Sequence, residues 1–140
     1  MSGDFIDSNV FVYLFDETDD RKRGTAERIV ESALQTNSAI ISFQVLQETL
    51  NVVTRKLATP MTAEGAKRFI EEVLAPLWRV SPSLALYHRA LDVQARYRYR
   101  FYDSLIVAAA LDAGCDRLYS EDLQSRQKIE RLTIENPFEN

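Results

Sequence analysis

The chain has 140 residues, of which 46% are hydrophobic and 27% are charged, and its formal net charge is -4. This length suits one domain with a sizeable buried core, so we expect a single domain over residues 1–140. The longest apolar stretch, residues 105–111, is far too short to cross a bilayer, which argues against a membrane protein. The acidic balance argues at first against a nucleic-acid partner, since proteins that bind phosphate usually carry excess positive charge.

The N-terminal segment and the cysteine content bear on the compartment. The segment MSGDFIDSNVFVYLF lacks the basic start and the small-residue cleavage site of a secretory signal. Cys115 is the one cysteine, so the chain cannot form an internal disulfide. Both features favour a cytoplasmic protein.

Short strand-like runs alternate with longer helical runs in the first part of the chain. In chain order we predict a strand, a short helix, a solvated charged turn, a second helix, a second strand and a third helix, at residues 4–7, 8–15, 16–23, 24–36, 39–42 and 43–57. Alternation of this kind is typical of an α/β fold with a parallel sheet.

The second part of the chain continues the alternation. After a helix N-capped by Thr62 we predict a strand, two further helices, a strand, a small helix and a last strand, with the main elements at residues 62–77, 78–80, 83–97, 103–114, 117–119 and 132–134. The helix that begins at Asp103 is apolar on nearly every face, so we expect it in the interior. The predicted sheet has four or five strands.

Four isolated acids lie beside the apolar runs: Asp7, Glu48, Asp103 and Asp122. A buried carboxylate is unfavourable unless it is paired or binds a metal. If the four side chains converge, they form an oxygen-only pocket suited to Mg²⁺ or Mn²⁺. Asp7 also follows the first strand, at the edge where open α/β sheets place their ligands.

Each acid also has a purely structural interpretation. Asp7 and Asp103 are each candidates for a helix N-cap, where an aspartate satisfies a free backbone N–H. Asp122 is a candidate cap for the small helix, and Glu121 beside it is a second candidate acid. Glu48 is harder to dismiss, because it lies at the margin of the apolar stripe of its helix, where a surface glutamate is not expected.

Other metal and nucleophile chemistry finds little support. His88 is the one histidine and lies among leucines at helical spacing, which favours packing or an exposed edge. One histidine and one cysteine are too few soft ligands for zinc, and Cys115 has no base beside it in the sequence. Carboxylates and a hard cation remain the chemistry that the residues favour.

Basic and aromatic residues alternate in the segment ARYRYRFYD. Arg96, Arg98 and Arg100 are interleaved with aromatic residues at positions 97, 99, 101 and 102. Guanidinium groups on phosphates and rings on bases suit single-stranded RNA. The alternative is a helix end with cations favoured by the helix dipole and aromatic rings packed inward.

Four segments in order resemble the acidic motifs of the PIN domain, and in particular its VapC type, the toxin half of bacterial toxin–antitoxin pairs. They are FIDSNVFVY, ISFQVLQETLNVV, FYDSLIVAAAL and LYSEDLQ. Any one of them is a weak signal, whereas the four in this order and spacing are specific. The resemblance runs from about Asp4 to the NPF at residues 136–138 and so covers nearly the whole chain.

The resemblance implies a three-layer α/β/α fold with helices around a parallel sheet. It also implies that the four acids hold Mg²⁺ or Mn²⁺. In the last motif, a hydroxyl residue, any residue and an aspartate match Ser120, Glu121 and Asp122, which selects Asp122 over Glu121. Asn9 and Ser120 match positions that orient the site by hydrogen bonding. Arg126 stands where many relatives have glycine, so the geometry of that loop is open, and its side chain is a candidate contact for phosphate.

The function implied by the resemblance is a metal-dependent endoribonuclease that leaves 5′-phosphate and 3′-hydroxyl ends. A cognate antitoxin, an RNA substrate and a homodimer are the implied partners. A surface around Phe69, Leu74 and Trp78 is a possible contact for a partner, although plain core packing is the explanation that these residues favour.

Two alternatives remain at this point. One is a PIN nuclease of RNA processing without an inhibitor, and the other is a PIN-like module that binds RNA or protein without cutting. A response-regulator receiver fits poorly, because it needs a lysine at the end of a later strand, and Ser120 stands directly after Tyr119.

Overall fold

In the computed structural model, which describes residues 3–139, six strands form one sheet. Their order is β3-β2-β1-β4-β6-β5, and all neighbours pair in parallel except β5 and β6. The strands are β1 (Asp4–Ile6), β2 (Ala39–Ser42), β3 (Trp78–Val80), β4 (Arg117–Tyr119), β5 (Lys128–Ile129) and β6 (Leu132–Glu135). The predicted parallel sheet is confirmed, with one antiparallel strand more than the four or five expected.

The extra strand replaces the small helix that was predicted after β4, and that prediction was wrong. Residues 120–127 form bends and turns, and β5 then pairs with β6 through a tight turn at Glu130 and Arg131. Such turns are usually marked by Asn-Gly or Asp-Gly, because their backbone needs a positive φ. Here the residue with positive φ is Glu130, at 56°. Because glutamate is not typical of such turns, the sequence carried no signal for the hairpin.

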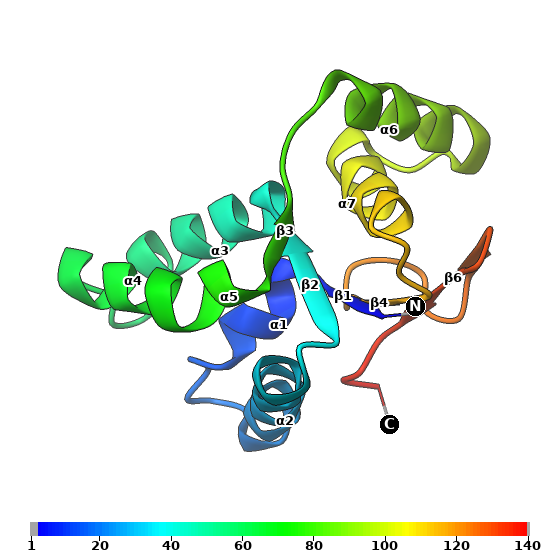
Figure 1. Cartoon of the computed structure of the whole chain (residues 1–140). Helices are drawn as coiled ribbons and strands as arrows, with labels where there is room; N and C mark the ends of the chain where they lie inside the picture. Colours follow the sequence, from blue (N-terminus) through cyan, green and yellow to red (C-terminus); the bar gives the residue numbers. More distant parts are fainter. Residues whose placement is uncertain (1–2, 140) are drawn as a thin grey trace.

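Helices cover both faces of the sheet, which confirms the three-layer arrangement. Figure 1 shows α2 on one side of the sheet and α7, with α6 packed beyond it, on the other. The regular helices are α1 (Ser8–Tyr13), α2 (Asp20–Thr36), α3 (Phe43–Arg55), α4 (Ala63–Phe69), α5 (Ala75–Leu77), α6 (Leu84–Tyr97) and α7 (Phe101–Asp112). No helix among residues 3–139 is long and apolar enough to cross a membrane.

The start of α2 differs from the prediction. The charged run was expected to be a turn, but the helix begins at Asp20, four residues before Gly24. Asp19 caps it, since its carboxylate accepts a hydrogen bond of 3.0 Å from the Lys22 backbone N–H. A carboxylate at this position also interacts favourably with the positive end of the helix dipole, which extends the helix into a polar segment.

The helix predicted over residues 62–77 is divided in three. A π-helical segment, η1 (Ile70–Leu74), lies between α4 and α5. Pro76 lies just after it in α5, and a proline in a regular α-helix clashes with the carbonyl four residues earlier. The wider π turn accommodates the proline, and the helical path continues into α5.

The interior receives side chains from most elements of the fold, and α7 supplies the longest buried run. Residues 104–111 of α7 are all buried, as the nearly continuous apolar sequence predicted. Phe69 and Leu74 belong to the core, with 8% and 0% exposure. Trp78 remains 41% exposed on β3, so only one of the three residues considered for a contact surface is at the surface.

Candidate metal site

Asp7 is the buried centre of the candidate site. It follows β1 and caps α1, and its side chain is 5% exposed. Its Oδ1 accepts a 2.7 Å hydrogen bond from the Ser8 backbone N–H, and its Oδ2 accepts a 2.7 Å bond from the Ser120 hydroxyl. The predicted N-cap role is therefore confirmed, but capping uses only one of the two oxygens.

Burial raises the pKa of Asp7 to about 7, which is the largest perturbation in the site. The hydrogen bonds from Ser120 and Ser8 oppose this shift, while the charges of Glu48 and Asp122 add to it. Two acids from distant parts of the chain thus lie near enough to repel the charge on Asp7. A cation bound here would offset both the unfavourable free energy of a buried carboxylate charge and the repulsion among the three acids.

Glu48 reaches the site from α3. Its Oε1 accepts a 3.3 Å hydrogen bond from the Ser8 hydroxyl, and that hydroxyl also lies 3.5 Å from Asp7 Oδ1. Its Oε2 accepts a 3.2 Å hydrogen bond from the Gln44 amide. The helix-face argument for Glu48 correctly indicated a side chain that points along the interior margin.

Asp122 joins the site from the segment after β4. Asn9 Nδ2 donates a 3.2 Å hydrogen bond to Asp122 Oδ2, and the Asp122 backbone N–H donates a 3.2 Å bond to the Ser120 hydroxyl. Asn9 Oδ1 also accepts from the Glu121 backbone N–H at 3.3 Å. Asn9 and Ser120 thus connect the segment of Asp122 by hydrogen bonds to α1 and to Asp7.

Glu121 points elsewhere. Its carboxylate accepts hydrogen bonds of 2.6 Å from the Tyr13 hydroxyl and 2.7 Å from Lys22 Nζ. These two bonds occupy both carboxylate oxygens of Glu121. Lys22 Nζ also donates a 3.0 Å hydrogen bond to the Tyr13 hydroxyl. Because its charge is already paired, Glu121 is a poor candidate for the fourth acid.

Asp103 lies in the first turn of α7 and is half-buried. The helix begins two residues earlier, so the predicted N-cap role of Asp103 is wrong: Arg100 occupies the cap position. Burial raises the pKa of the Asp103 carboxyl, the charge of Asp122 raises it further, and that of Arg100 lowers it. Within residues 3–139 the Asp103 carboxylate accepts no hydrogen bond, which leaves its oxygens free.

The donor set fits a hard cation in its chemistry. The four side chains offer only carboxylate oxygens, the ligands that Mg²⁺ and Mn²⁺ prefer. In the described part of the chain, however, no three Asp, Glu, His or Cys side chains are close enough to hold an ion as they stand. Asp7, Glu48 and Asp122 form an open cluster that is linked by hydrogen bonds through Ser8, Asn9 and Ser120. Asp103 makes none of these bonds and is related to the cluster through the repulsion between its charge and that of Asp122.

Two site residues were not singled out in the sequence. Ser8 bridges Asp7 and Glu48, and Gln44 connects Glu48 with the start of α7. Ser8 belongs to the same DSN triplet as Asn9. Gln44 lies one helical turn before Glu48 on the apolar side of α3, and a polar residue in that position was the available signal.

The predicted RNA-binding arginines lie at the surface. Arg96, Arg98 and Arg100 are exposed, and none makes an ion pair within residues 3–139. Arg96 lies over the ring of Tyr97 at 5.5 Å. Of the interleaved aromatic residues only Tyr102 is well exposed, at 66%. The packed-inward interpretation thus holds for the other rings, and the arginines remain available.

The backbone of Arg126, where the sequence left the loop geometry open, is left-handed. Its φ is 70°, in the left-handed region that favours glycine, and its N–H donates a 2.7 Å hydrogen bond to the Ile134 carbonyl. Its exposed guanidinium lies 3.8 Å from Glu139. This chain thus places an arginine in a backbone conformation that favours glycine.

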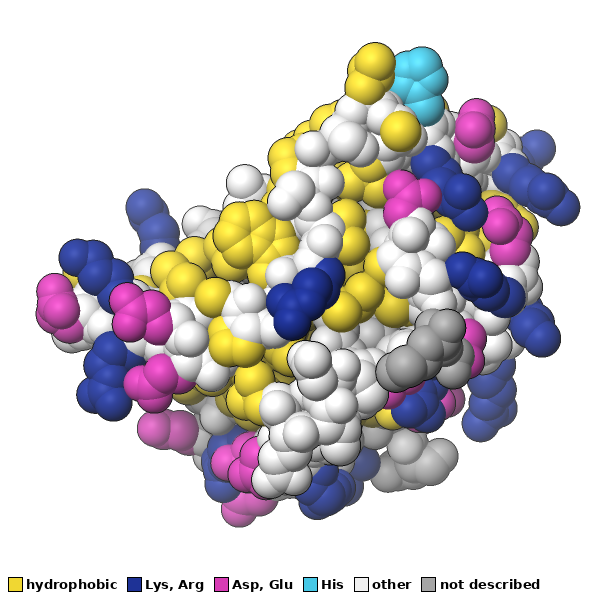
Figure 2. All heavy atoms as spheres, viewed as in Figure 1, with side chains coloured by type: hydrophobic (Ala, Val, Ile, Leu, Met, Phe, Trp, Pro, Cys, Tyr) yellow, Lys and Arg dark blue, Asp and Glu magenta, His cyan; other side chains and the backbone are white. Residues whose placement is uncertain are grey.

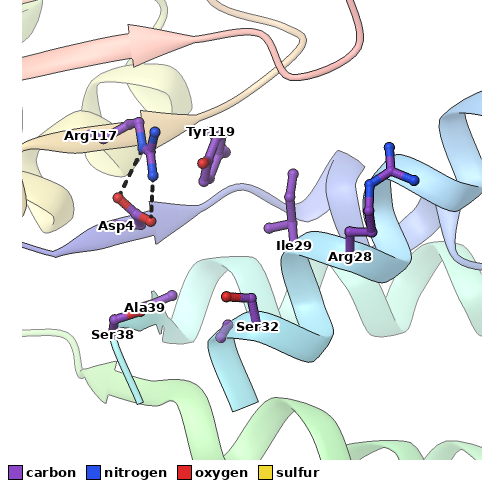
Figure 3. Close-up of a pocket in the computed structure, with 9 residues that line it drawn as sticks. Asp4, Arg28, Ile29, Ser32, Ser38, Ala39, Arg117 and Tyr119 are labelled. Carbon is purple, nitrogen blue, oxygen red and sulfur yellow. Dashed lines mark hydrogen bonds and ion pairs between the residues drawn. The ribbon is translucent and has the colours of Figure 1, made fainter. Parts of the chain in front are cut away.

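A polar cavity of about 200 Å³ lies at the opposite end of β1 and is unrelated to the acids. In Figure 3, Arg117 donates to both oxygens of Asp4, at 3.0 and 2.9 Å. Arg117 also packs its guanidinium over the ring of Tyr119 at 4.5 Å. These residues form a structural ion pair between β1 and β4.

The strand order and the helices on both faces of the sheet define a three-layer α/β domain. A family model for the PIN domain matches residues 5–130, and the chain therefore belongs to the PIN domain family. No curated protein matches the chain in sequence.

Several solved structures share this fold. VapC20 of Mycobacterium tuberculosis, described as a toxin that cleaves the sarcin–ricin loop, is 24% identical with a TM-score of 0.61, and the match covers 86% of this chain and 90% of that one. A toxin–antitoxin complex from Klebsiella pneumoniae is 16% identical with a TM-score of 0.70, covering 99% and 100%. VapBC from Salmonella typhimurium, bound to DNA, is 19% identical with a TM-score of 0.67, covering 98% and 99%. At these identities the likeness establishes the fold.

Proposed function

We propose that the chain is an endoribonuclease dependent on Mg²⁺ or Mn²⁺ and the toxin of a toxin–antitoxin pair. The observation that carries the proposal is the buried Asp7, whose pKa is raised to about 7 by burial and by the charges of two acids from distant segments. Such a group, at the carboxyl edge of a parallel sheet, marks a candidate catalytic site. An RNA substrate implies that the protein works in the cytoplasm.

In this proposal Asp7, Glu48, Asp103 and Asp122 hold the cation against the scissile phosphate. A bound divalent ion would polarise the phosphate and lower the pKa of a water molecule. Ser120 and Ser8 orient Asp7, and Asn9 orients Asp122. Attack by water on phosphorus breaks the bond to the 3′ oxygen and leaves a 5′-phosphate and a 3′-hydroxyl.

The test is cleavage of structured RNA with and without divalent metal. Asp7→Asn and Asp103→Asn should each lower kcat by at least about 100-fold, since each removes one charge from the cation site. Asp92→Asn, which changes an exposed aspartate of α6, is the matched control and should cleave normally. Full activity of either site variant, or activity in EDTA, would refute the proposal.

The three exposed arginines and Tyr102 are proposed to contact the RNA. Guanidinium groups would neutralise phosphates, and the exposed ring offers a face for an unstacked base. Replacing Arg96, Arg98 and Arg100 together by alanine should reduce the slope of log binding against log salt by about 2 for single-stranded RNA. An unchanged slope would place the RNA elsewhere.

An antitoxin and a second copy of the chain are the proposed protein partners. The relatives with this fold include toxin–antitoxin complexes, which is the support for the antitoxin. Figure 2 shows hydrophobic side chains gathered on one face of the molecule. Among the exposed large hydrophobic residues of the chain are Trp78, Leu84 and Leu91, at 41%, 76% and 53%. Such a patch suits a homodimer, and light scattering at micromolar concentration would reveal a monomer if the proposal is wrong.

A nuclease of RNA processing would share this site but would have no inhibitor. A module that does not cut would bind RNA without cleaving it in Mg²⁺, Mn²⁺ or Co²⁺. Copurification of a small partner that abolishes cleavage separates the toxin from both alternatives.

A further inference from the structure

Gln44 occupies a buried position between the two helices that carry Glu48 and Asp103. It lies on α3 and is 4% exposed. Its Nε2 donates to Glu48 Oε2 at 3.2 Å and to the backbone carbonyl of Tyr102 at 3.0 Å. Tyr102 directly precedes Asp103 in the first turn of α7, so one amide group connects one candidate ligand with the backbone beside another.

The orientation of this amide is determined by its neighbours. An amide nitrogen has two protons, and here each has an acceptor. Turning the amide over would place its oxygen against the Glu48 carboxylate and the Tyr102 carbonyl, both of which are acceptors only. In the observed orientation Gln44 Oε1 is buried and has no hydrogen-bond partner among the described residues.

A residue retained for stability alone would not leave a polar atom unpaired in the interior. Unsatisfied buried acceptors are unfavourable and rare, so each one calls for an explanation. A methionine or leucine would fill the same space without the unpaired oxygen. The stabilising contribution of Gln44 is therefore a poor explanation for an amide at this position.

We propose that Gln44 is a positioning residue, which holds Glu48 and the start of α7 in the arrangement that receives the cation. Ser8 holds the other oxygen of Glu48, so the carboxylate is fixed from two sides. The inference rests on the proposed function, because it presumes that these acids bind a divalent ion. Residues that orient ligands in this way commonly change metal affinity by 10- to 100-fold when replaced.

The experiment measures Mn²⁺ affinity by the electron paramagnetic resonance signal of free Mn²⁺, together with thermal melting in EDTA. Gln44→Met removes the amide at nearly constant volume, and Gln44→Leu repeats the test with another shape. Both should raise the Kd for Mn²⁺ about tenfold, while melting in EDTA stays unchanged or rises. Gln47→Met, an exposed change on the same helix beside Glu48, is the matched control and should bind Mn²⁺ like the wild type.

A structural role predicts the opposite pair of results. Unchanged Mn²⁺ affinity with a lower melting temperature in EDTA would overturn the proposal, and so would failure of both variants to fold. Absence of Mn²⁺ binding by the wild-type chain would refute the proposed function and this inference with it. Binding by the wild type that both variants retain would refute this inference alone.

Discussion

The Asp7 carboxyl combines burial, hydrogen bonds and repulsion in one group. Its burial raises the pKa to about 7, against 3.8 for an ordinary aspartate. At pH values between these two pKa values, Asp7 holds a proton in the folded chain that it has lost in the unfolded chain. Without metal, the free energy of unfolding therefore falls as pH rises from about 4 to 7, and the full loss is present above 7.

Asp7→Asn should accordingly stabilise the metal-free protein at pH 8 while abolishing activity. The raised pKa implies that ionised Asp7 lowers the free energy of unfolding by up to roughly 4 kcal/mol. We therefore expect the free energy of unfolding of the variant, measured in urea at pH 8, to be higher than that of the wild type by about 2–4 kcal/mol. The gain should shrink as pH falls toward 4, where both proteins carry a neutral side chain. Asp92→Asn is the control without a pH-dependent difference, and a variant no more stable than wild type at pH 8 would contradict the burial argument.

Neighbouring acids can have different roles when their surroundings differ. Glu121 and Asp122 are adjacent, yet the first pairs with Lys22 and Tyr13 while the second faces Asn9. The sequence motif preferred Asp122 by resemblance alone. The geometry supplies the physical reason, because a carboxylate that already has an ammonium partner is a weaker metal ligand.

At the scale of elements, the segment between β4 and β6 illustrates how a turn can escape prediction. Two non-glycine residues there, Arg126 and Glu130, have φ values of 70° and 56°. Each L-residue in the left-handed region is strained by roughly 1 kcal/mol. Backbone hydrogen bonds to β6, such as that of the Arg126 N–H to Ile134, hold the segment in this conformation.

Arg126→Gly should relieve this strain. We expect the free energy of unfolding to rise by about 0.5–1 kcal/mol, since the gain in backbone fit exceeds the greater entropy of glycine in the unfolded chain. The lost contact with Glu139 is exposed and contributes little. Arg126→Ala, which removes the same side chain but keeps the strain, is the control. Equal stability of the two variants in urea would show that the backbone there is not strained.

At the scale of the whole molecule, the four acids come from four separate segments of the chain. Asp7 follows β1, Asp122 follows β4, and Glu48 and Asp103 come from α3 and α7. The mutual repulsion of these charges opposes folding until a cation enters. Cation binding and stability are therefore linked in this fold.

Mn²⁺ should raise the melting temperature of the wild-type protein. At a concentration about 100 times the Kd, linkage adds roughly 2.7 kcal/mol, which corresponds to about 5–10 °C for a chain of this size. The rise should be larger at pH 8 than at pH 6, because at the lower pH the cation must displace the proton of Asp7. Asp92→Asn should respond like the wild type and Asp7→Asn should not. A wild-type melting temperature that does not change on addition of Mn²⁺ would contradict a metal site formed by these acids.

The sequence by itself determined the element order, the buried α7 and the candidate acids, because periodicity and isolated polar residues report directly on local burial. Local patterns did not show three further features of the fold. Capping set the helix starts at Asp20 and Phe101, positive φ angles allowed the hairpin of β5, and a backbone clash at Pro76 divided the helix before it. Only the tertiary structure decided which acids share a site. Ser8, Asn9 and Lys22 donate hydrogen bonds to Glu48, Asp122 and Glu121, and each of these contacts joins residues far apart in the chain.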